Sequence, residues 1–359
     1  MNITEIVTYT VPPQSRRREE LSVCNVFFCL LVLFIHTIAE PVDGYLRESL
    51  PYFFAVGFWR LSSFVVQGYF FLSGIKLFLG RKKESAGRFY LGRLRRVLLP
   101  YAAVFCLFAL YFVLTGALKL TAGDFLWNLL TGKLCGHFYY VILILQFYLL
   151  TPFLQRMLPK TDPVLGCITS LLVMVLCKLY LPDGIALLTG QPFGDNGLLF
   201  TSYLFYFIAG AYCGLAYDRF RILLDRYRLS LLITWALLGA VNWIFIWLNG
   251  RGIYYAPWLE VFHVLYCIYA IMGSLSLGYL LREKKPFQTK FFRLADKWSY
   301  HVYLIHPLVI FAGNSIFYRL GLQSLTLRFG LRALLVYGSM ALLVWLLGNL
   351  PKIHKNKKA

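Results

Sequence analysis

Residues 22–39, SVCNVFFCLLVLFIHTIA, form an apolar stretch that follows the polar N-terminal segment. A membrane-spanning α-helix needs about 20 predominantly apolar residues, and similar stretches recur along this chain between short polar segments. The sequence therefore predicts an all-α integral membrane protein, a bundle of about ten transmembrane helices. The ten predicted helices are 22–39, 54–79, 97–115, 138–155, 164–181, 199–217, 229–249, 258–281, 299–319 and 329–350.

The composition excludes a soluble protein. Hydrophobic residues make up 59% of the chain and charged residues 14%, whereas a soluble domain carries about 25% charged residues. We expect one membrane domain over residues 22–350, a cytoplasmic N-terminal segment over 1–21 and a basic cytoplasmic tail over 351–359. The first apolar stretch lacks a small-residue cleavage site, so we expect it to remain as the first helix.

The formal net charge of +20 comes from basic residues that lie between the apolar stretches. Most of them fall on one side of the predicted helices, and the positive-inside rule assigns that side to the cytoplasm. Both termini of this multi-pass protein are therefore predicted to be cytoplasmic. No RNA-binding, helix-turn-helix or zinc-finger pattern accompanies the basic residues, so we expect no nucleic-acid partner.

The sequence lacks the familiar motifs of soluble enzymes. It has no GxSxG elbow, Walker loop or HExxH pattern, which disfavours a hydrolase, an ATPase and a zinc protease. Seven of the eight cysteines lie within apolar stretches, and there is no CxxC pair or disulfide framework. We therefore expect no metal site.

His36 lies near the end of the first predicted helix. At about 1.5 Å per residue from Ser22, it lies roughly 20 Å into a core about 30 Å thick. An ionisable group at the bilayer centre costs at least about 2 to 3 kcal/mol, which makes His36 a candidate functional residue. Glu40 follows on the same helical face, where its carboxylate could orient the imidazole. The alternative is a neutral histidine bonded to a neighbouring helix, with Glu40 at the water interface.

Lys76 and Arg332 are basic residues that fall inside predicted helices. Both lie about one turn from the ends of their helices. Their long side chains are expected to extend to the lipid headgroups, so neither is predicted to have a functional role.

Residues 88–101, RFYLGRLRRVLLPY, run from a basic loop into the third predicted helix. Arginines in this segment could bind the phosphates of an anionic ligand such as a coenzyme A thioester. Arg93 and Arg96, three residues apart, are expected on one face of a helix. The alternative is that the segment anchors the protein to anionic lipids.

Several further polar residues are candidates. In SYHVYLIHP, His301 and His306 are expected near the cytoplasmic end of the ninth predicted helix, with Tyr303 three residues before His306. Pro307 leaves a carbonyl of the preceding turn without its donor. That distortion could open a polar pocket or only kink the helix. His137 begins the fourth predicted helix, as an interfacial residue or as a catalyst. Ser73, in FVVQGYFFLSG, could line a cavity, although Ser and Gly also serve close helix packing.

Several of these stretches together resemble the acyltransferase-3 family of bacterial multi-pass membrane acyltransferases. The resemblance covers most of the chain and depends on the order and spacing of five motifs. They are LVLFIH ending at His36, FFLSG at Phe70–Gly74, RLRRVLLPY at Arg93–Tyr101, HFYYVILILQFYLLTP from His137, and SYHVYLIHP ending at Pro307.

The resemblance implies transfer of an acyl group, often acetyl or succinyl, from cytoplasmic acyl-coenzyme A to a glycan or a lipid-linked acceptor. It implies a multi-pass protein of the bacterial plasma membrane, and it implies that His36 is the essential histidine of the first helix. Arg93 and Arg96 match basic residues at the start of the third helix and are the expected donor site. Further residues match recurrent motif positions: Ser73, His137, Tyr303 and His306.

One position departs from the family pattern. Many members carry a basic residue eleven positions before the histidine, where this chain has Asn25. The family also includes intercellular-adhesin-like polysaccharide modification proteins, which have been viewed both as transferases and as glycan exporters. The alternative function is therefore a transporter or flippase of a glycan or lipid-linked sugar, without acyl-transfer chemistry.

For acyl transfer, His36 is expected either to take the proton of the acceptor hydroxyl or to carry the acyl group itself, with Glu40 orienting it. No tightly bound cofactor is expected, because acyl-coenzyme A is the donor substrate. The predicted partners are this donor, the glycan or lipid-linked acceptor and the membrane lipids. The thioester would have to reach His36 through a channel from the inner arginines.

Overall fold

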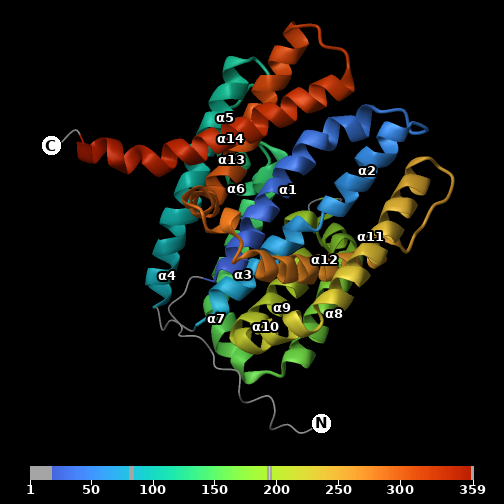
Figure 1. The fold of residues 1–359 in the computed structure, drawn as a ribbon, viewed down its shortest axis with the longest axis vertical. Helices are drawn as coiled ribbons and strands as arrows, with labels where there is room; N and C mark the ends of the chain where they lie inside the picture. The colour runs from blue at the N-terminus through green and yellow to red at the C-terminus, as the bar shows by residue number, and fades with distance from the viewer. Residues whose placement is uncertain (1–17, 81–84, 192–193, 195, 357–359) are drawn as a thin grey trace.

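The computed structural model describes residues 18–80, 85–191, 194 and 196–356 (Figure 1). These residues form helices and no strand, which confirms the all-α prediction. The α-helices are α1 Glu19–Gly44, α2 Leu50–Ser62, α3 Val65–Phe78, α4 Ala86–Arg93, α5 Leu99–Leu114, α6 Ala122–Thr131, α7 Tyr139–Met157, α8 Pro163–Thr189, α9 Leu204–Leu215, α10 Tyr217–Arg226, α11 Arg228–Gly250, α12 Leu259–Leu281, α13 Lys290–Arg319 and α14 Leu325–Asn356. Shorter elements are a π-helical turn at Leu94–Leu98 and 3₁₀ turns at Gly136–Phe138, Leu158–Lys160, Asn196–Leu198, Phe200–Tyr203 and Lys285–Gln288.

Nine helical segments of the described chain are long and apolar enough to cross a membrane, so the protein is a multi-pass integral membrane protein, as predicted. The sixth predicted helix corresponds to Phe200–Leu215, a shorter apolar helix. Its length of roughly 24 Å falls short of a hydrocarbon core about 30 Å thick. The even number of crossings, and with it the cytoplasmic side of both termini, stays a prediction. The nine segments are Glu19–Gly44, Leu50–Phe78, Ala86–Leu114, Gly136–Lys160, Pro163–Thr189, Arg228–Gly250, Leu259–Leu281, Lys290–Arg319 and Leu325–Asn349.

The two terminal segments are only partly described. α1 begins at Glu19 and α14 continues to Asn356, so both helices extend beyond the predicted limits of the membrane domain. Residues 1–17 and 357–359 lie outside the described residues, and the division into a membrane domain with two cytoplasmic ends stays a prediction.

The second membrane segment is broken near its middle. Ser63 and Phe64 separate α2 from α3. Next to the break, the Ser63 hydroxyl donates to the carbonyl oxygen of Arg60 at 2.7 Å, and the Tyr266 phenol of α12 donates to that of Leu61 at 2.6 Å. Backbone groups inside a bilayer need partners within the protein, so these hydroxyls make the break possible.

α3 and α9 pack with their backbones in direct contact. A Cβ atom at Gly74 would overlap the carbonyl oxygen of Phe207, and one at Gly210 would overlap that of Phe71. Small residues let membrane helices approach this closely. The glycine of the FFLSG motif therefore serves close helix packing.

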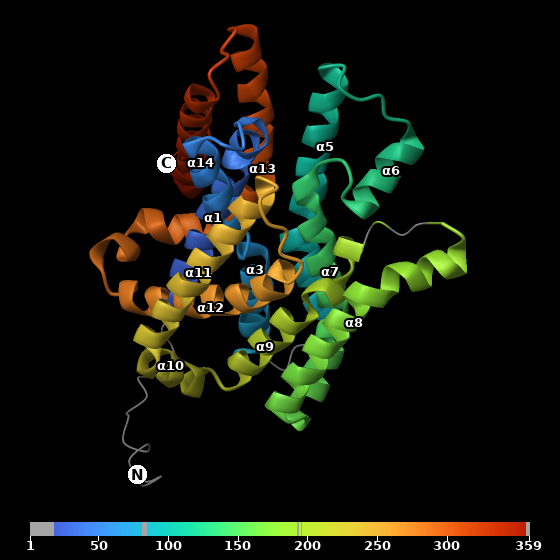
Figure 2. The ribbon, with the colours of Figure 1, turned by 90° about the vertical axis from the view of Figure 1, so that its right-hand side faces the viewer.

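α1 lies at the centre of the bundle and packs against α2, α12, α13 and α14 (Figure 1). In contrast, α11 lies at the edge of the bundle in Figure 1 and α8 at its edge in Figure 2, and 11% of each spanning segment is buried. Because exposed apolar surface on a membrane protein faces lipid, α8 and α11 belong to the periphery. The central position of α1 encloses its polar residues between neighbouring helices.

Candidate active site

Three of the predicted residues form one cluster, which we name the histidine cluster. It consists of His36 on α1, His137 in the 3₁₀ turn before α7, and His306 on α13. The ring centroids are 5.0 Å apart for His36 and His306, 5.7 Å for His137 and His306, and 6.5 Å for His36 and His137. His137 and His306 are buried, whereas His36 is half-buried. The fold thus joins three motifs that are far apart in the sequence.

Pro307 sets the orientation of the His306 ring. Proline has no N–H, so the carbonyl of Tyr303, four residues earlier, lacks its helical donor. The Nδ1 of His306 lies 2.7 Å from this carbonyl oxygen. Because a carbonyl only accepts, Nδ1 carries the proton and Nε2 presents a lone pair. This Nε2 is buried and has no hydrogen-bond partner among the described residues.

His306 lies deeper in the bundle than predicted. α13 begins at Lys290 and not at residue 299, so His306 is sixteen residues into its helix. His36 is seventeen residues into α1, which begins at Glu19. The prediction that His306 lies near the cytoplasmic end is therefore wrong, because the helix has two further turns before the apolar stretch. The contact between the two rings places them at one depth.

Both ring nitrogens of His137 are engaged. Nε2 donates to the carbonyl oxygen of Leu304 at 3.0 Å, and Nδ1 lies 3.2 Å from the Cys135 sulfur. Burial raises the pKa of the Cys135 thiol to about 11, so the thiol keeps its proton at neutral pH and can donate to Nδ1. With 2% of its surface exposed, His137 lies inside the protein. It joins the start of α7 to α13.

Tyr303 and Ser73 lie beside the histidine cluster. The Tyr303 phenol donates to the carbonyl oxygen of His137. Its ring centroid is 5.5 Å from that of Tyr140 and 6.4 Å from that of Tyr300. The half-buried Ser73 hydroxyl contacts the Tyr140 phenol. Ser73 therefore reaches the cluster through two tyrosines.

The carboxylate of Glu40 is engaged by two arginines of α14. One oxygen lies 2.6 Å from Arg328 Nη2, and the other contacts Arg332 Nη2. These contacts do not support Glu40 as the residue that orients His36, because both oxygens have cationic partners. The predicted extension of Arg332 to the headgroups is wrong, since 1% of its surface is exposed. A buried guanidinium requires a counter-ion, and the Glu40 carboxylate provides it for Arg332.

A π-helical turn separates the two predicted donor-binding arginines. Leu94–Leu98 form a wider turn than an α-helix, so the argument that Arg93 and Arg96 share one helical face does not hold. The Arg93 guanidinium lies 5.0 Å from the Phe89 ring centroid and 4.9 Å from that of Tyr148. Arg96 is exposed. The contact with two aromatic rings holds Arg93 in place.

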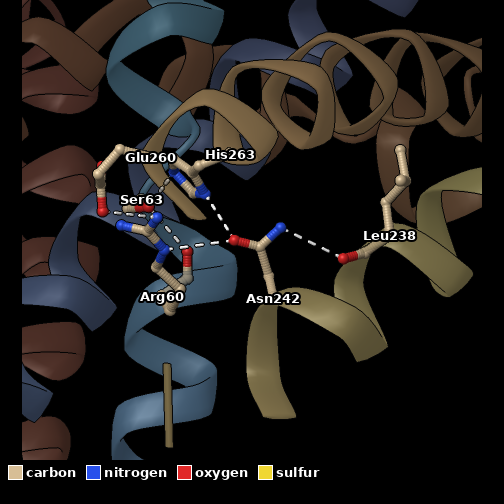
Figure 3. A network of polar contacts seen from close by, with 6 residues as sticks. All are labelled: Arg60, Ser63, Leu238, Asn242, Glu260 and His263. Carbon is tan, nitrogen blue, oxygen red and sulfur yellow. Dashed lines mark hydrogen bonds and ion pairs between the residues drawn. The ribbon is translucent and has the colours of Figure 1, made fainter. Parts of the chain in front are cut away.

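A second polar cluster inside the spanning segments was not predicted (Figure 3). Arg60 of α2 forms an ion pair with Glu260 of α12 at 2.9 Å, and its Nε lies 3.4 Å from the Asn242 amide oxygen of α11. His263 Nδ1 lies 3.1 Å from the same oxygen, and its Nε2 lies 2.9 Å from the Ser63 hydroxyl. We name these five residues the Arg60 cluster.

The signal for the Arg60 cluster was present in the sequence. Arg60, Asn242 and His263 lie inside the predicted helices 54–79, 229–249 and 258–281, and all three are buried. The cost of a polar group in a bilayer, which singled out His36, applies to them equally. Their contact with one another depends on how three helices pack.

Within the described ranges, no group of three or more His, Cys, Asp or Glu side chains is arranged to hold a metal ion. In the histidine cluster, His137 uses both ring nitrogens in hydrogen bonds and His306 uses Nδ1. Nε2 of His306 is buried and remains available to accept a proton.

Comparisons with known proteins show what this chain is similar to. A family model described as an acyltransferase domain matches residues 19–348. Two Staphylococcus aureus proteins, from strains MSSA476 and N315, are named probable poly-beta-1,6-N-acetyl-D-glucosamine export protein. Each is 24% identical over 320 residues, which cover 84% of this chain and 85% of the relative. A protein of that name from strain MRSA252 is 25% identical over 247 residues, covering 64% and 65%. No solved structure matches the chain.

Proposed function

Since the chain belongs to the acyltransferase-3 family, we propose that it transfers an acyl group from acyl-coenzyme A to a hydroxyl of a cell-envelope or exported glycan. The family and the apolar helices make it a multi-pass membrane acyltransferase, which confirms the resemblance seen in the sequence. The donor, the acyl group (acetyl or succinyl) and the acceptor belong to the proposal. The observation that carries it is the contact of half-buried His36 with His306.

His36 is the proposed general base. It takes the proton of the acceptor hydroxyl while the hydroxyl oxygen attacks the thioester carbonyl carbon. The carbon–sulfur bond then breaks, and the coenzyme A thiolate takes the proton from the imidazolium. The products are an ester and free coenzyme A, so atoms and protons balance without a further cofactor. General-base assistance contributes about 10²- to 10⁴-fold to the rate.

His306 is the proposed orienting residue, in place of Glu40. Its Nε2 presents a lone pair because Nδ1 donates to the Tyr303 carbonyl. An N–H of His36 that donates to this lone pair would leave the other nitrogen of His36 to accept the substrate proton. The same contact would stabilise the imidazolium that forms.

A series of aromatic contacts supports a route for the donor. Arg93 lies against Tyr148, and Tyr300 lies among phenols that include Tyr148. Tyr300 in turn stacks on Tyr303, next to the histidine cluster. We propose that Arg93 and exposed Arg96 bind the nucleotide phosphates, with the pantetheine arm following the tyrosines inward. Phenols tolerate both the apolar arm and its amide groups.

The names of the relatives support a polymer of amino sugars as the acceptor class. They describe probable export proteins for poly-beta-1,6-N-acetyl-D-glucosamine. Such a polymer carries many free hydroxyls, which the proposed reaction requires. Its length makes transfer at the membrane, during or after export, a suitable point for modification.

Glycan export without acyl transfer is the second candidate function. The names of the relatives favour it, and so does the Arg60 cluster, because polar side chains inside a membrane can line a path for a polar substrate. In an exporter, the histidine cluster would contribute to such a path without chemistry.

Purified protein with labelled acetyl- or succinyl-coenzyme A and envelope glycan distinguishes the two candidates. Label transferred to the glycan supports the acyltransferase, whereas label that stays on the donor while glycan crosses vesicle membranes supports the exporter. His36→Ala is expected to abolish transfer. His301→Ala is the matched control, because this half-buried histidine of α13 packs on Trp298, outside the cluster. Full transfer by His36→Ala would overturn the role of His36.

Mass spectrometry of the quenched reaction separates the two possible roles of His36. A general base leaves the imidazole unmodified throughout turnover. A residue that carries the acyl group adds one acyl mass to the peptide containing His36 when donor is present without acceptor. Either result fits acyl transfer, and the added mass would replace the general-base step by a covalent one.

A further inference from the structure

We infer that Arg332 of α14 positions His36 by bonding a backbone carbonyl that Pro41 leaves without a partner. The inference rests on the proposed function of His36 and names a residue that acts through it. Arg332 lies in the last helix and belongs to none of the sequence motifs that singled out the histidines.

The carbonyl in question belongs to Thr37, the residue directly after His36. Pro41 lies inside α1 and has no N–H, so the Thr37 carbonyl, four residues earlier, lacks its helical donor. Arg332 Nη1 donates to this oxygen at 3.1 Å. Thr37 is fully buried, so the bond replaces a partner that neither the helix nor water supplies.

The remaining nitrogens of Arg332 join α1 to α13. Nε donates to the Asn314 amide oxygen of α13 at 2.9 Å, and Nη2 contacts the Glu40 carboxylate of α1. A guanidinium holds its donors in one plane, so a single side chain fixes both helices. These helices carry His36 and His306, whose relative placement the proposed mechanism requires.

Arg328 provides a matched comparison. It contacts the other oxygen of Glu40 at 2.6 Å from the same face of α14, one turn earlier. Its side chain is 25% exposed, against 1% for Arg332. Arg328 therefore shares the ion pair with Arg332, whereas the hydrogen bond to the Thr37 carbonyl belongs to Arg332.

The test compares Arg332→Gln, Arg328→Gln and Pro41→Ala in the acyl-transfer assay, with rates normalised to folded protein. A displacement of about 1 Å at a reacting group can cost about 100-fold in rate. We expect Arg332→Gln to lower kcat by about that factor, with the donor KM within about twofold of the parent. Arg328→Gln should lose less than about threefold. Equal losses in the two arginine variants would overturn the inference.

Pro41→Ala is expected to restore kcat in the Arg332→Gln variant, which would not happen if Arg332→Gln only destabilised the protein. Alanine at position 41 supplies the N–H that bonds the Thr37 carbonyl, so the hydrogen bond from Arg332 is no longer needed. We expect the kcat of the double variant, Pro41→Ala with Arg332→Gln, to be at least about tenfold higher than the kcat of Arg332→Gln alone. If Arg332→Gln causes the same kcat loss with and without Pro41→Ala, the role of the carbonyl is overturned.

The activity of the parent protein distinguishes a failure of the proposed function from a failure of this inference. If the parent transfers no acyl group, the proposed function fails, and the Pro41–Arg332 cycle is then measured by thermal unfolding. A smaller unfolding penalty for Arg332→Gln in the Pro41→Ala variant than in the parent supports the bond to the Thr37 carbonyl. Additive penalties overturn it, whatever substrate the protein uses.

Discussion

The Nδ1 of His306 lies 2.7 Å from the carbonyl oxygen of Tyr303, which Pro307 deprives of its helical donor. The carbonyl freed by Pro41 is bonded by Arg332 in the same way. In a membrane, a freed carbonyl finds another donor within the protein because water is absent. At both places a proline thus fixes a polar side chain beside the histidine cluster.

Pro307→Ala is expected to lower kcat by about tenfold while the fold remains intact. The new N–H competes for the Tyr303 carbonyl and releases the His306 ring from its fixed orientation. Steady-state kinetics and thermal unfolding measure the two effects separately. Pro182→Ala, a proline inside peripheral α8, is the control and should retain activity. Unchanged kcat in Pro307→Ala would show that the orientation of His306 does not matter.

Arg96→Ala is expected to raise the KM for acyl-coenzyme A. A charge-assisted hydrogen bond contributes about 1.5 to 3 kcal/mol, which corresponds to roughly tenfold to 150-fold. Arg156→Ala removes an exposed cation at the end of α7 and should leave KM within about twofold. If both variants respond alike, the arginines of residues 88–101 anchor the protein to lipid and do not bind the donor.

Glu260→Ala is expected to lower the free energy of unfolding by about 1 to 3 kcal/mol, because it leaves the buried Arg60 cation without its counter-ion. This expected loss of unfolding free energy is smaller than for a fully buried ion pair, because 61% of the Glu260 side chain is exposed. Thermal unfolding in detergent measures it. Asp225→Ala, which breaks the exposed pair with Arg228, should cost less than about 1 kcal/mol.

A double variant completes this test. Arg60→Met combined with Glu260→Ala removes both charges, so it should be more stable than Glu260→Ala alone. A double variant less stable than the single one would show that Arg60 stabilises the protein through its contact with Asn242 as well as through its ion pair.

Gly74→Ala is expected to destabilise the protein by about 1 to 3 kcal/mol, because the added methyl overlaps the carbonyl oxygen of Phe207. Gly338→Ala is the matched control in α14, where a Cβ meets no atom within 4 Å. That change should be neutral or stabilising, since alanine favours a helix by about 1 kcal/mol over glycine. Equal unfolding temperatures for the two variants would contradict the close packing of α3 and α9.

Much of the candidate site was predictable because a bilayer penalises every polar group in an apolar stretch. That rule and the motif spacing led to His36, His137 and His306. It also applies to Arg60, Asn242 and His263, which were overlooked although they lie in predicted helices. Glu40 was assigned to His36 from helical spacing alone, whereas its partners are arginines of the last helix.

Two local features could not be predicted from periodicity. The break at Ser63 depends on a hydroxyl from α12, which satisfies a freed carbonyl across the helix boundary. The π-helical turn at Leu94–Leu98 changes which arginines share a face, and its Val97 carbonyl accepts a hydrogen bond from Tyr300 of α13. Both deviations depend on partners that are distant in the sequence.

The sequence by itself determined that this chain crosses the membrane many times, because apolar length is a local property that lipid selects directly. It also determined which residues resemble those of a membrane acyltransferase. The tertiary structure decided which polar residues meet: His36 with His306, and Arg332 with Glu40 and the Thr37 carbonyl. Such pairs depend on how separate helices pack, and the local composition of each helix does not predict that packing.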